Sequence, residues 1–220
     1  MTMPEPITII GVGAGLLGLM TQLARRYFAL AKEVVDIVLG FIALVLCLPV
    51  LAVCALIIRL SSKGPVFFSQ NRVGKGGKLF EMHKLRTMYV DAESASGAVW
   101  ASKHDPRIVA TCRWMRRSHL DELPQLINVI RGDMSLVGPR PERPEILAEL
   151  EKRYPQVRRR LSVRPGITGL AQVRNGYDTS IDAFRYKLEA DLEYIERSNW
   201  STEIRILAAT LGKFKDGSAH

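Results

Sequence analysis

The residues of this chain best suited to chemistry are an adjacent acidic pair, Asp121 and Glu122, in an arginine-rich stretch. Arg113, Arg116 and Arg117 precede the pair by a few residues. Two carboxylates beside several guanidinium groups suit phosphate chemistry with magnesium, because the cation offsets negative charge while a carboxylate attacks phosphorus. The structural alternative is that Asp121 only caps a helix and that Glu122 lies in its first turn.

A helix over residues 121–131 is expected to carry the acidic pair. Proline is tolerated in the first turn of a helix and glycine often ends one, and the chain has Pro124 and Gly132 at these places. The acidic residues would then lie at the amino-terminal end of the helix, where free amides and the macrodipole favour anions.

Arg140 follows this helix closely and stands between Pro139 and Pro141. The two prolines hold its backbone extended, so presenting the guanidinium to a phosphate loses little entropy. The pattern favours a phosphate-binding role for Arg140.

A β-hairpin is predicted ahead of these residues, over 66–88. Two apolar and aromatic runs flank Gly74-Lys75-Gly76-Gly77-Lys78, which is a turn signal with a basic tip. Arg72, Lys84 and Arg86 lie on or near the strands, and each in isolation fits a solvated face. Residues 91–104 are small and polar, which predicts a loop.

The carboxy-terminal third is expected to be helical, near residues 143–153, 183–197 and 202–214. The last of these segments alternates apolar clusters with Arg205 and Lys213. Such a pattern fits a helix that lies at a membrane interface, and it fits a terminal helix packed on the core equally well.

Residues 37–58 contain no charged side chain and would form a helix of about 33 Å, close to the bilayer's hydrocarbon thickness of about 30 Å. A spanning helix would leave one of its two basic flanks outside, against the positive-inside rule. Pro49, inside the run, removes a backbone hydrogen bond. A re-entrant helix that is broken at Pro49 and returns to the same face is therefore favoured over a spanning one. The flanking basic residues are Arg25, Arg26, Lys32, Arg59 and Lys63.

Residues 7–24 are also uncharged and contain Gly13-x-Gly15-x-x-Gly18. This pattern occurs in dinucleotide-binding folds, and Asp36 falls about where the ribose-binding acid would lie. The long uncharged run that follows leaves no room for alternating strands and amphipathic helices. Small residues are common in membrane helices, where they permit close packing. The glycines therefore favour a membrane segment over an NAD-binding oxidoreductase.

The chain has 220 residues, enough for one domain with a core plus a membrane segment. Its formal net charge of +9 suits an anionic partner such as nucleic acid, an acidic membrane face or a phosphorylated substrate. The three cysteines and four histidines form no disulfide framework and no zinc motif. A membrane-anchored binding protein would use the charge, but it has no use for the acidic pair beside Arg140.

Five ordered blocks of the sequence resemble the monotopic phosphoglycosyl transferases, also called bacterial sugar transferases, and the resemblance covers residues 33–212. The blocks are GPVFFSQNRVG (64–74), KLRTM (84–88), DPR (105–107), LDELPQLINVIRGDMSLVGPRPE (120–142) and RPGITGLAQV (164–173).

The resemblance implies an α+β, mostly helical fold: a re-entrant membrane helix plus a small cytoplasmic catalytic domain with a short β-hairpin and interfacial amphipathic helices. It divides the chain into an apolar and basic membrane-associated segment (1–32), a re-entrant helix broken at Pro49 (33–60) and a catalytic domain (61–220). It also implies a place in the bacterial inner (cytoplasmic) membrane, with the catalytic domain on the cytoplasmic face.

The resemblance further implies a reaction. With Mg²⁺, Asp121 would attack the β-phosphate of a UDP-sugar, release UMP and hold the phosphosugar until a polyprenyl (undecaprenyl) phosphate takes it. Glu122 would help to hold the metal or to position the nucleophile. The expected partners are this donor, this acceptor and membrane lipid, with no nucleic acid, while the donor sugar and a homo-oligomer stay open. Phosphates would be bound by Lys84, Arg116 and Arg140, and the nucleotide-sugar pocket would be shaped by Arg164, Gly166, Thr168 and Gln172.

Overall fold

The computed structural model describes residues 8–92, 105–175 and 184–215. The described part is α+β and mostly helical, as expected, with two small sheets of two strands each. Most of the loop predicted over 91–104 lies outside the described residues.

One long helix, α1 (Thr8–Ser61), contains both apolar segments. Gly13, Gly15 and Gly18 therefore lie in a helix and not in the strand-to-helix turn of a dinucleotide-binding fold. By its internal contacts the chain divides into two units, residues 1–35 and 36–220. Pro49 and the site residues belong to the second unit.

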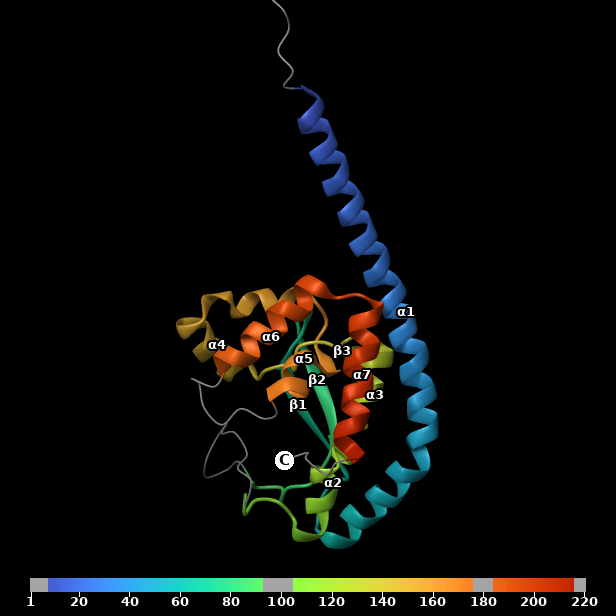
Figure 1. Cartoon of the computed structure of the whole chain (residues 1–220). Coiled ribbons are helices and arrows are strands. Elements are labelled where there is room, and N and C mark those ends of the chain that lie inside the picture. Colours follow the sequence, from blue (N-terminus) through green and yellow to red (C-terminus); the bar gives the residue numbers. More distant parts are fainter. Residues whose placement is uncertain (1–7, 93–104, 176–183, 216–220) are drawn as a thin grey trace, which may run out of the picture. The chain divides into compact units, whose positions relative to one another are not determined.

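Pro49 lies inside α1, and helical geometry continues through it. The structure thus shows a continuous helix at the position where the sequence predicted a break. A proline removes one hydrogen bond and bends a helix without having to end it. Figure 1 shows that the axis of α1 bends within its light-blue to teal part.

The carboxy-terminal part of α1 packs one stripe of residues on the rest of its unit. Asp36, Gly40, Cys54 and Ile58 are buried at helical spacing. The other faces expose large apolar side chains, and within the described residues one helical stretch, 18–61, is long and apolar enough to cross a membrane. The exposed residues include Phe41, Ile42, Leu46, Val53 and Leu56.

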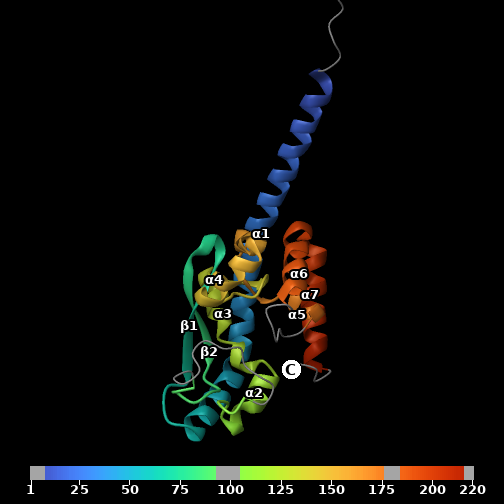
Figure 2. The ribbon, with the colours of Figure 1, turned by 90° about the vertical axis from the view of Figure 1, so that its left-hand side faces the viewer.

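The predicted hairpin is confirmed. Strands β1 (Phe67–Val73) and β2 (Leu79–Leu85) pair antiparallel, from Phe67 opposite Leu85 to Val73 opposite Leu79. Gly76 and Gly77 take φ values of 67° and 81° in the turn, where residues without a Cβ meet no steric penalty. Figure 2 shows β1 and β2 side by side, next to α3 and α4.

The segment that carries the acidic pair differs from the single predicted helix. Helix α2 (Arg113–Arg117) is followed by a 3₁₀ turn (Leu120–Glu122), and the α-helix α3 (Gln125–Arg131) begins only after Pro124. Gly132 ends α3 at φ 82°, as predicted. The acidic pair therefore lies before α3 and not in its first turn, so the macrodipole of a longer helix does not explain its environment.

The second sheet is parallel and joins β3 (Ser135–Val137) to β4 (Gly166–Thr168). A Cβ at Gly166 or at Gly169 would collide with the backbone of Gly138. These glycines let the two segments approach closely, and the chain leaving β3 then runs directly into the sequence Pro139-Arg140-Pro141.

The helices predicted for the carboxy-terminal third are confirmed. They are α4 (Pro144–Arg153), α6 (Phe184–Arg197) and α7 (Trp200–Lys215), and a short helix α5 (Leu170–Asn175) precedes α6. Helix α7 packs Ile206 into a core cluster with Val137 and Tyr194. It leaves Ile204 and Leu211 65% and 70% exposed, so one face of α7 packs on the core while another remains apolar and open.

Candidate active site

The acidic pair lies in a backbone segment of unusual conformation. Helix α2 ends at Arg117, with Ser118 as its C-cap, and His119 adopts a left-handed conformation with φ 53° and ψ 18°. Left-handed backbone is uncommon for residues with a side chain and often marks functional sites. The following 3₁₀ turn places both carboxyl groups inside the protein, since Asp121 is 5% and Glu122 8% exposed.

Glu122 is held by two basic side chains that are distant in sequence. Lys84 Nζ on β2 donates to Glu122 Oε1 at 2.7 Å, and the Arg140 guanidinium donates to both carboxylate oxygens at 2.6 and 3.2 Å. Burial raises the pKa of Glu122, but Arg140 and Lys84 outweigh burial and hold this pKa well below its usual range. Glu122 is therefore ionised and fully engaged.

Asp121 is in a contrasting environment. Its Oδ1 is buried and accepts no hydrogen bond from the described residues. Burial raises the pKa of Asp121 to about 6, although the positive charge of Lys84 acts in the opposite direction. Two adjacent carboxyl groups with pKa values displaced in opposite directions are typical of sites that divide roles between them. Asp121 is the carboxylate with an uncommitted oxygen.

The fit of a magnesium ion can be judged from these two carboxylates. Among the described residues there is no group of three or more His, Cys, Asp or Glu side chains that could hold a metal. Magnesium is commonly bound by one or two carboxylates together with substrate phosphates and water. Asp121 Oδ1 fits as such a ligand, whereas both oxygens of Glu122 already accept from Lys84 and Arg140. The residues present thus fit a metal that is shared with a bound diphosphate.

Lys84 reaches the acidic pair because α3 is fixed against β2. Asn128, which is fully buried, donates from Nδ2 to the Glu81 carbonyl at 2.7 Å and accepts from the His83 amide at 3.1 Å. These two bonds attach α3 to the strand next to Lys84. The spacing between Lys84 and the 3₁₀ turn is therefore set by the hydrogen bonds of the Asn128 side chain to the β2 backbone as well as by the ion pair.

Arg116 is half-buried on α2, and its charge lowers the pKa of Asp121. Its charge also contributes to the low pKa of Asp105, which is about 2. The main cause of that low pKa is the bidentate hydrogen bonding of Arg107, which outweighs the opposing effect of burial. Arg113 and Arg117 are exposed. Of the three arginines that precede the pair, Arg116 is the one that the structure brings into the field of the site.

The predicted pocket residues lie further along the chain and make internal contacts. Gly166 donates its amide to the Pro139 carbonyl at 2.9 Å and so lies next to Arg140. Thr168 Oγ1 lies 2.7 Å from Thr210 Oγ1, and Gln172 Nε2 donates to the Ile167 carbonyl at 2.9 Å. Arg164 lies beside Gly132, at the end of α3. Their part in binding a nucleotide-sugar stays a prediction.

Sequence reasoning missed two residues near the site, Arg72 and His119. Arg72 was compatible with a solvated face, yet burial lowers its pKa to about 10, with the charge of Arg140 as the next cause. The structure places Gln70 and Arg72 at less exposed positions of β1, but the sequence of this strand has no alternation of apolar and polar residues that would have indicated it. No pattern in the sequence indicates the left-handed backbone at His119.

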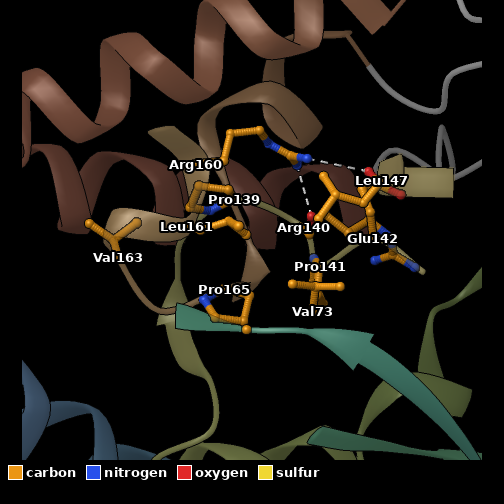
Figure 3. Close-up of a pocket in the computed structure, with 11 residues that line it drawn as sticks. Val73, Pro139, Arg140, Pro141, Glu142, Leu147, Arg160, Leu161, Val163 and Pro165 are labelled. Atoms are coloured by element: carbon orange, nitrogen blue, oxygen red, sulfur yellow. Dashed lines mark hydrogen bonds and ion pairs between the residues drawn. The ribbon is translucent and has the colours of Figure 1, made fainter. Parts of the chain in front are cut away.

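A small hollow of about 20 Å³, partly open to solvent, lies behind the loop that carries Arg140. Apolar side chains such as Leu147, Leu161 and Val163 line much of it, and Arg160 forms part of its wall (Figure 3). Neither Asp121 nor Glu122 lines this hollow, so it is not assigned as the substrate site.

Comparison with known proteins agrees with the geometry. A family model described as "Bacterial sugar transferase" matches residues 27–216. A Bacillus subtilis protein provisionally named an undecaprenyl-phosphate N-acetylgalactosaminyl 1-phosphate transferase is 47% identical over 142 residues, which are 64% of this chain and 78% of that protein.

Two further relatives differ in the sugar that their names give. The UDP-N-acetylgalactosamine-undecaprenyl-phosphate N-acetylgalactosaminephosphotransferase of Aeromonas hydrophila is 40% identical over 84% of this chain, which spans 43% of that protein. The UDP-glucose:undecaprenyl-phosphate glucose-1-phosphate transferase of Caulobacter vibrioides is 40% identical over 86% of this chain and 71% of its own length. The match over most of its length shows that this chain belongs to the bacterial sugar transferase family.

Proposed function

We propose that the chain transfers a sugar-1-phosphate from a UDP-sugar to undecaprenyl phosphate, giving a polyprenyl-diphosphate sugar and UMP. This is the first membrane step in assembling a polysaccharide or glycoconjugate. The observation that carries the proposal is the buried, uncommitted Oδ1 of Asp121 beside two cations that Glu122 holds in place. The family and the names of three relatives support the reaction class.

The proposed chemistry proceeds by two displacements at one phosphorus atom. The Asp121 carboxylate attacks the β-phosphorus of the UDP-sugar, and the bond from this phosphorus to the bridging oxygen breaks to release UMP. An oxygen of undecaprenyl phosphate then attacks the same phosphorus, and the Asp121 carboxylate leaves. Lys84 and Arg140 would offset the charge of the phosphate oxygens, with Arg116 further out. A bound Mg²⁺ would supply additional neutralisation of the diphosphate.

The test of the reaction class is release of UMP from a panel of UDP-sugars in the presence of undecaprenyl phosphate. UDP-glucose and UDP-N-acetylgalactosamine are the first donors to compare, because relatives named for each are equally similar to this chain. A lipid product that carries two phosphates and one sugar is expected with at least one donor. Lipid glycosylation with release of UDP instead of UMP would contradict the proposal.

The pH dependence of the first step should follow Asp121. The carboxylate is the attacking form, so kcat/KM for the donor should fall about tenfold per pH unit below the Asp121 pKa of about 6 and level off above it. Added Mg²⁺ should move the midpoint to lower pH, because a cation favours the charged form of a neighbouring carboxyl. A rate that stays constant through this pKa, or that falls as pH rises, would exclude Asp121 as the attacking group.

The membrane topology that we propose is re-entrant, with the catalytic domain on the cytoplasmic face of the inner membrane. It is supported by the exposed apolar faces of α1, by Pro49 inside the helix and by basic residues on both flanks. Because this topology keeps the catalytic domain at the cytoplasmic surface of the membrane, the lipid phosphate and the soluble donor can both reach its site.

Cysteine labelling tests this topology in a variant from which Cys47, Cys54 and Cys112 have been removed. Ala24→Cys and Lys63→Cys, both at exposed positions, should each react only with reagents that reach the cytoplasm. Pro49→Leu restores a backbone hydrogen bond and should let part of the population span the membrane, which would expose position 24 to the periplasm. Periplasmic labelling of Ala24→Cys without the Pro49 change would contradict the re-entrant topology.

A further inference from the structure

The loop of residues 139–142, which carries Arg140, is held at every one of its backbone carbonyls. Two prolines leave this loop short of amide donors, so its carbonyls need partners from elsewhere. Four donors from three separate segments supply them. The bonds run from Gly166 N to Pro139 O (2.9 Å), from Arg160 Nη2 to Arg140 O (2.8 Å), from Arg72 Nη1 to Pro141 O (3.0 Å) and from Val73 N to Glu142 O (3.0 Å).

Arg160 is the donor at Arg140 itself, and its side chain is only 4% exposed. Its guanidinium makes contacts in three directions. Nε donates to Asp191 Oδ2 at 2.8 Å, Nη1 lies 3.7 Å from Glu142 Oε1, and Nη2 donates to the Arg140 carbonyl. Figure 3 shows the side chain with its bonds to Glu142 and to the Arg140 carbonyl.

We propose that Arg160 is a positioning residue for Arg140. The Arg140 side chain binds both oxygens of Glu122, and such a fork depends closely on where its backbone lies. Arg160 holds the carbonyl of the same residue and so fixes the peptide from which the fork extends. This inference rests on the proposed function, because it assigns Arg160 a role through a side chain that would bind the donor phosphates.

The surroundings of Arg160 explain why an arginine is needed. Asp191 and Glu142 orient the guanidinium, and Lys187 pairs with Glu142 at 2.7 Å, so the buried cluster contains two acids and two bases. The planar guanidinium carries several donors in fixed directions, and one group can therefore serve an acid and a carbonyl together. A lysine ammonium at position 160 keeps the charge but lacks this fork.

The first test is Arg160→Lys, with Arg159→Lys as its matched control. Arg159 is the preceding residue, 57% exposed and paired with Glu196, so the same exchange there leaves the loop untouched. Arg160→Lys should keep its pairing with Asp191, and its melting temperature should fall because the Arg140 carbonyl loses its donor. Its kcat for UMP release should fall roughly tenfold or more, because a displaced Arg140 guanidinium offsets less of the charge on the reacting phosphate. Arg159→Lys should match the wild type.

A double-mutant cycle with Arg140→Lys separates positioning from a general loss of structure. If Arg160 acts through Arg140, adding Arg160→Lys to Arg140→Lys should slow turnover no further. Losses that multiply in the double variant would overturn the positioning role. Wild-type turnover in Arg140→Lys alone would instead count against the phosphate-binding role of Arg140, which belongs to the proposed function.

A second variant keeps the inference testable if Arg160→Lys does not fold. Asp191→Asn preserves shape and leaves Arg160 in place, but it removes the charge that orients the guanidinium. It should lower kcat several-fold in the wild-type background and have no effect in the Arg140→Lys background. An equal loss in both backgrounds would refute the inference.

Discussion

Asp121→Asn should abolish both the burst of UMP and the covalent phosphosugar, while the donor still binds. The amide has the size and shape of the carboxylate but no negative charge with which to attack phosphorus. Because Oδ1 of Asp121 accepts no hydrogen bond from the described residues, the exchange breaks no contact of that oxygen. The loss in rate should be at least about a thousandfold, as for removal of a covalent nucleophile in general.

The measurement uses enzyme, UDP-sugar and Mg²⁺ without the lipid acceptor. Wild-type enzyme should release about one UMP per active site in a burst, and mass spectrometry should find the phosphosugar on the peptide that contains Asp121. Asp91→Asn, the same exchange at an exposed position, should behave as the wild type. If the lipid phosphate attacks directly, wild-type enzyme without lipid will give neither burst nor adduct. That result would contradict the mechanism of two displacements through Asp121.

The elements that the sequence predicted correctly are those with local signals. Gly76 and Gly77 supply the left-handed turn of the hairpin, and Gly132 ends α3, because each signal acts within a few residues. The predicted start of the helix over 121–131 was wrong, because α3 begins only at Gln125 and a 3₁₀ turn precedes Pro124. Propensity alone does not distinguish these two conformations.

The site could be predicted only as a set of residue types, because its contacts are long-range. Lys84 and Glu122 lie 38 positions apart, and no periodicity joins a strand residue to a 3₁₀ turn. The acidic pair could be singled out from its own residue types and Lys84 only through the family resemblance, whereas the structure adds the pairing that engages Glu122 and leaves Asp121 Oδ1 without a donor among the described residues.

Asp36 is a second residue whose long-range contact could not be predicted from the sequence. Its position in the sequence fits a ribose-binding acid, whereas the structure buries it in α1, where it accepts from Ser135 Oγ at 2.6 Å. Ser135 begins β3, so a buried polar contact joins the apolar helix to the strand that leads towards Arg140. Such a partner, 99 positions away, has no local signature.

Glu122→Gln should reveal what the second carboxylate of the pair does. The exchange leaves Lys84 and Arg140, 17% and 20% exposed, without their counter-charge. Removing one partner of a largely buried ion pair costs roughly 3 kcal/mol or more, so the melting temperature should fall clearly. Turnover should fall as well, because the two cations lose the group that holds them beside Asp121.

A bound diphosphate should partly reverse this loss of stability. In the wild type Lys84 and Arg140 are already neutralised by Glu122, whereas in Glu122→Gln the phosphates of UDP would provide the missing negative charge. Saturating UDP should therefore raise the melting temperature of Glu122→Gln by more than that of the wild type. Lys75→Gln, a charge change at the exposed hairpin tip, should show the wild-type increase. If UDP stabilises Glu122→Gln no more than the wild type, the two cations do not face the phosphates, and Glu122 acts chiefly in holding the fold.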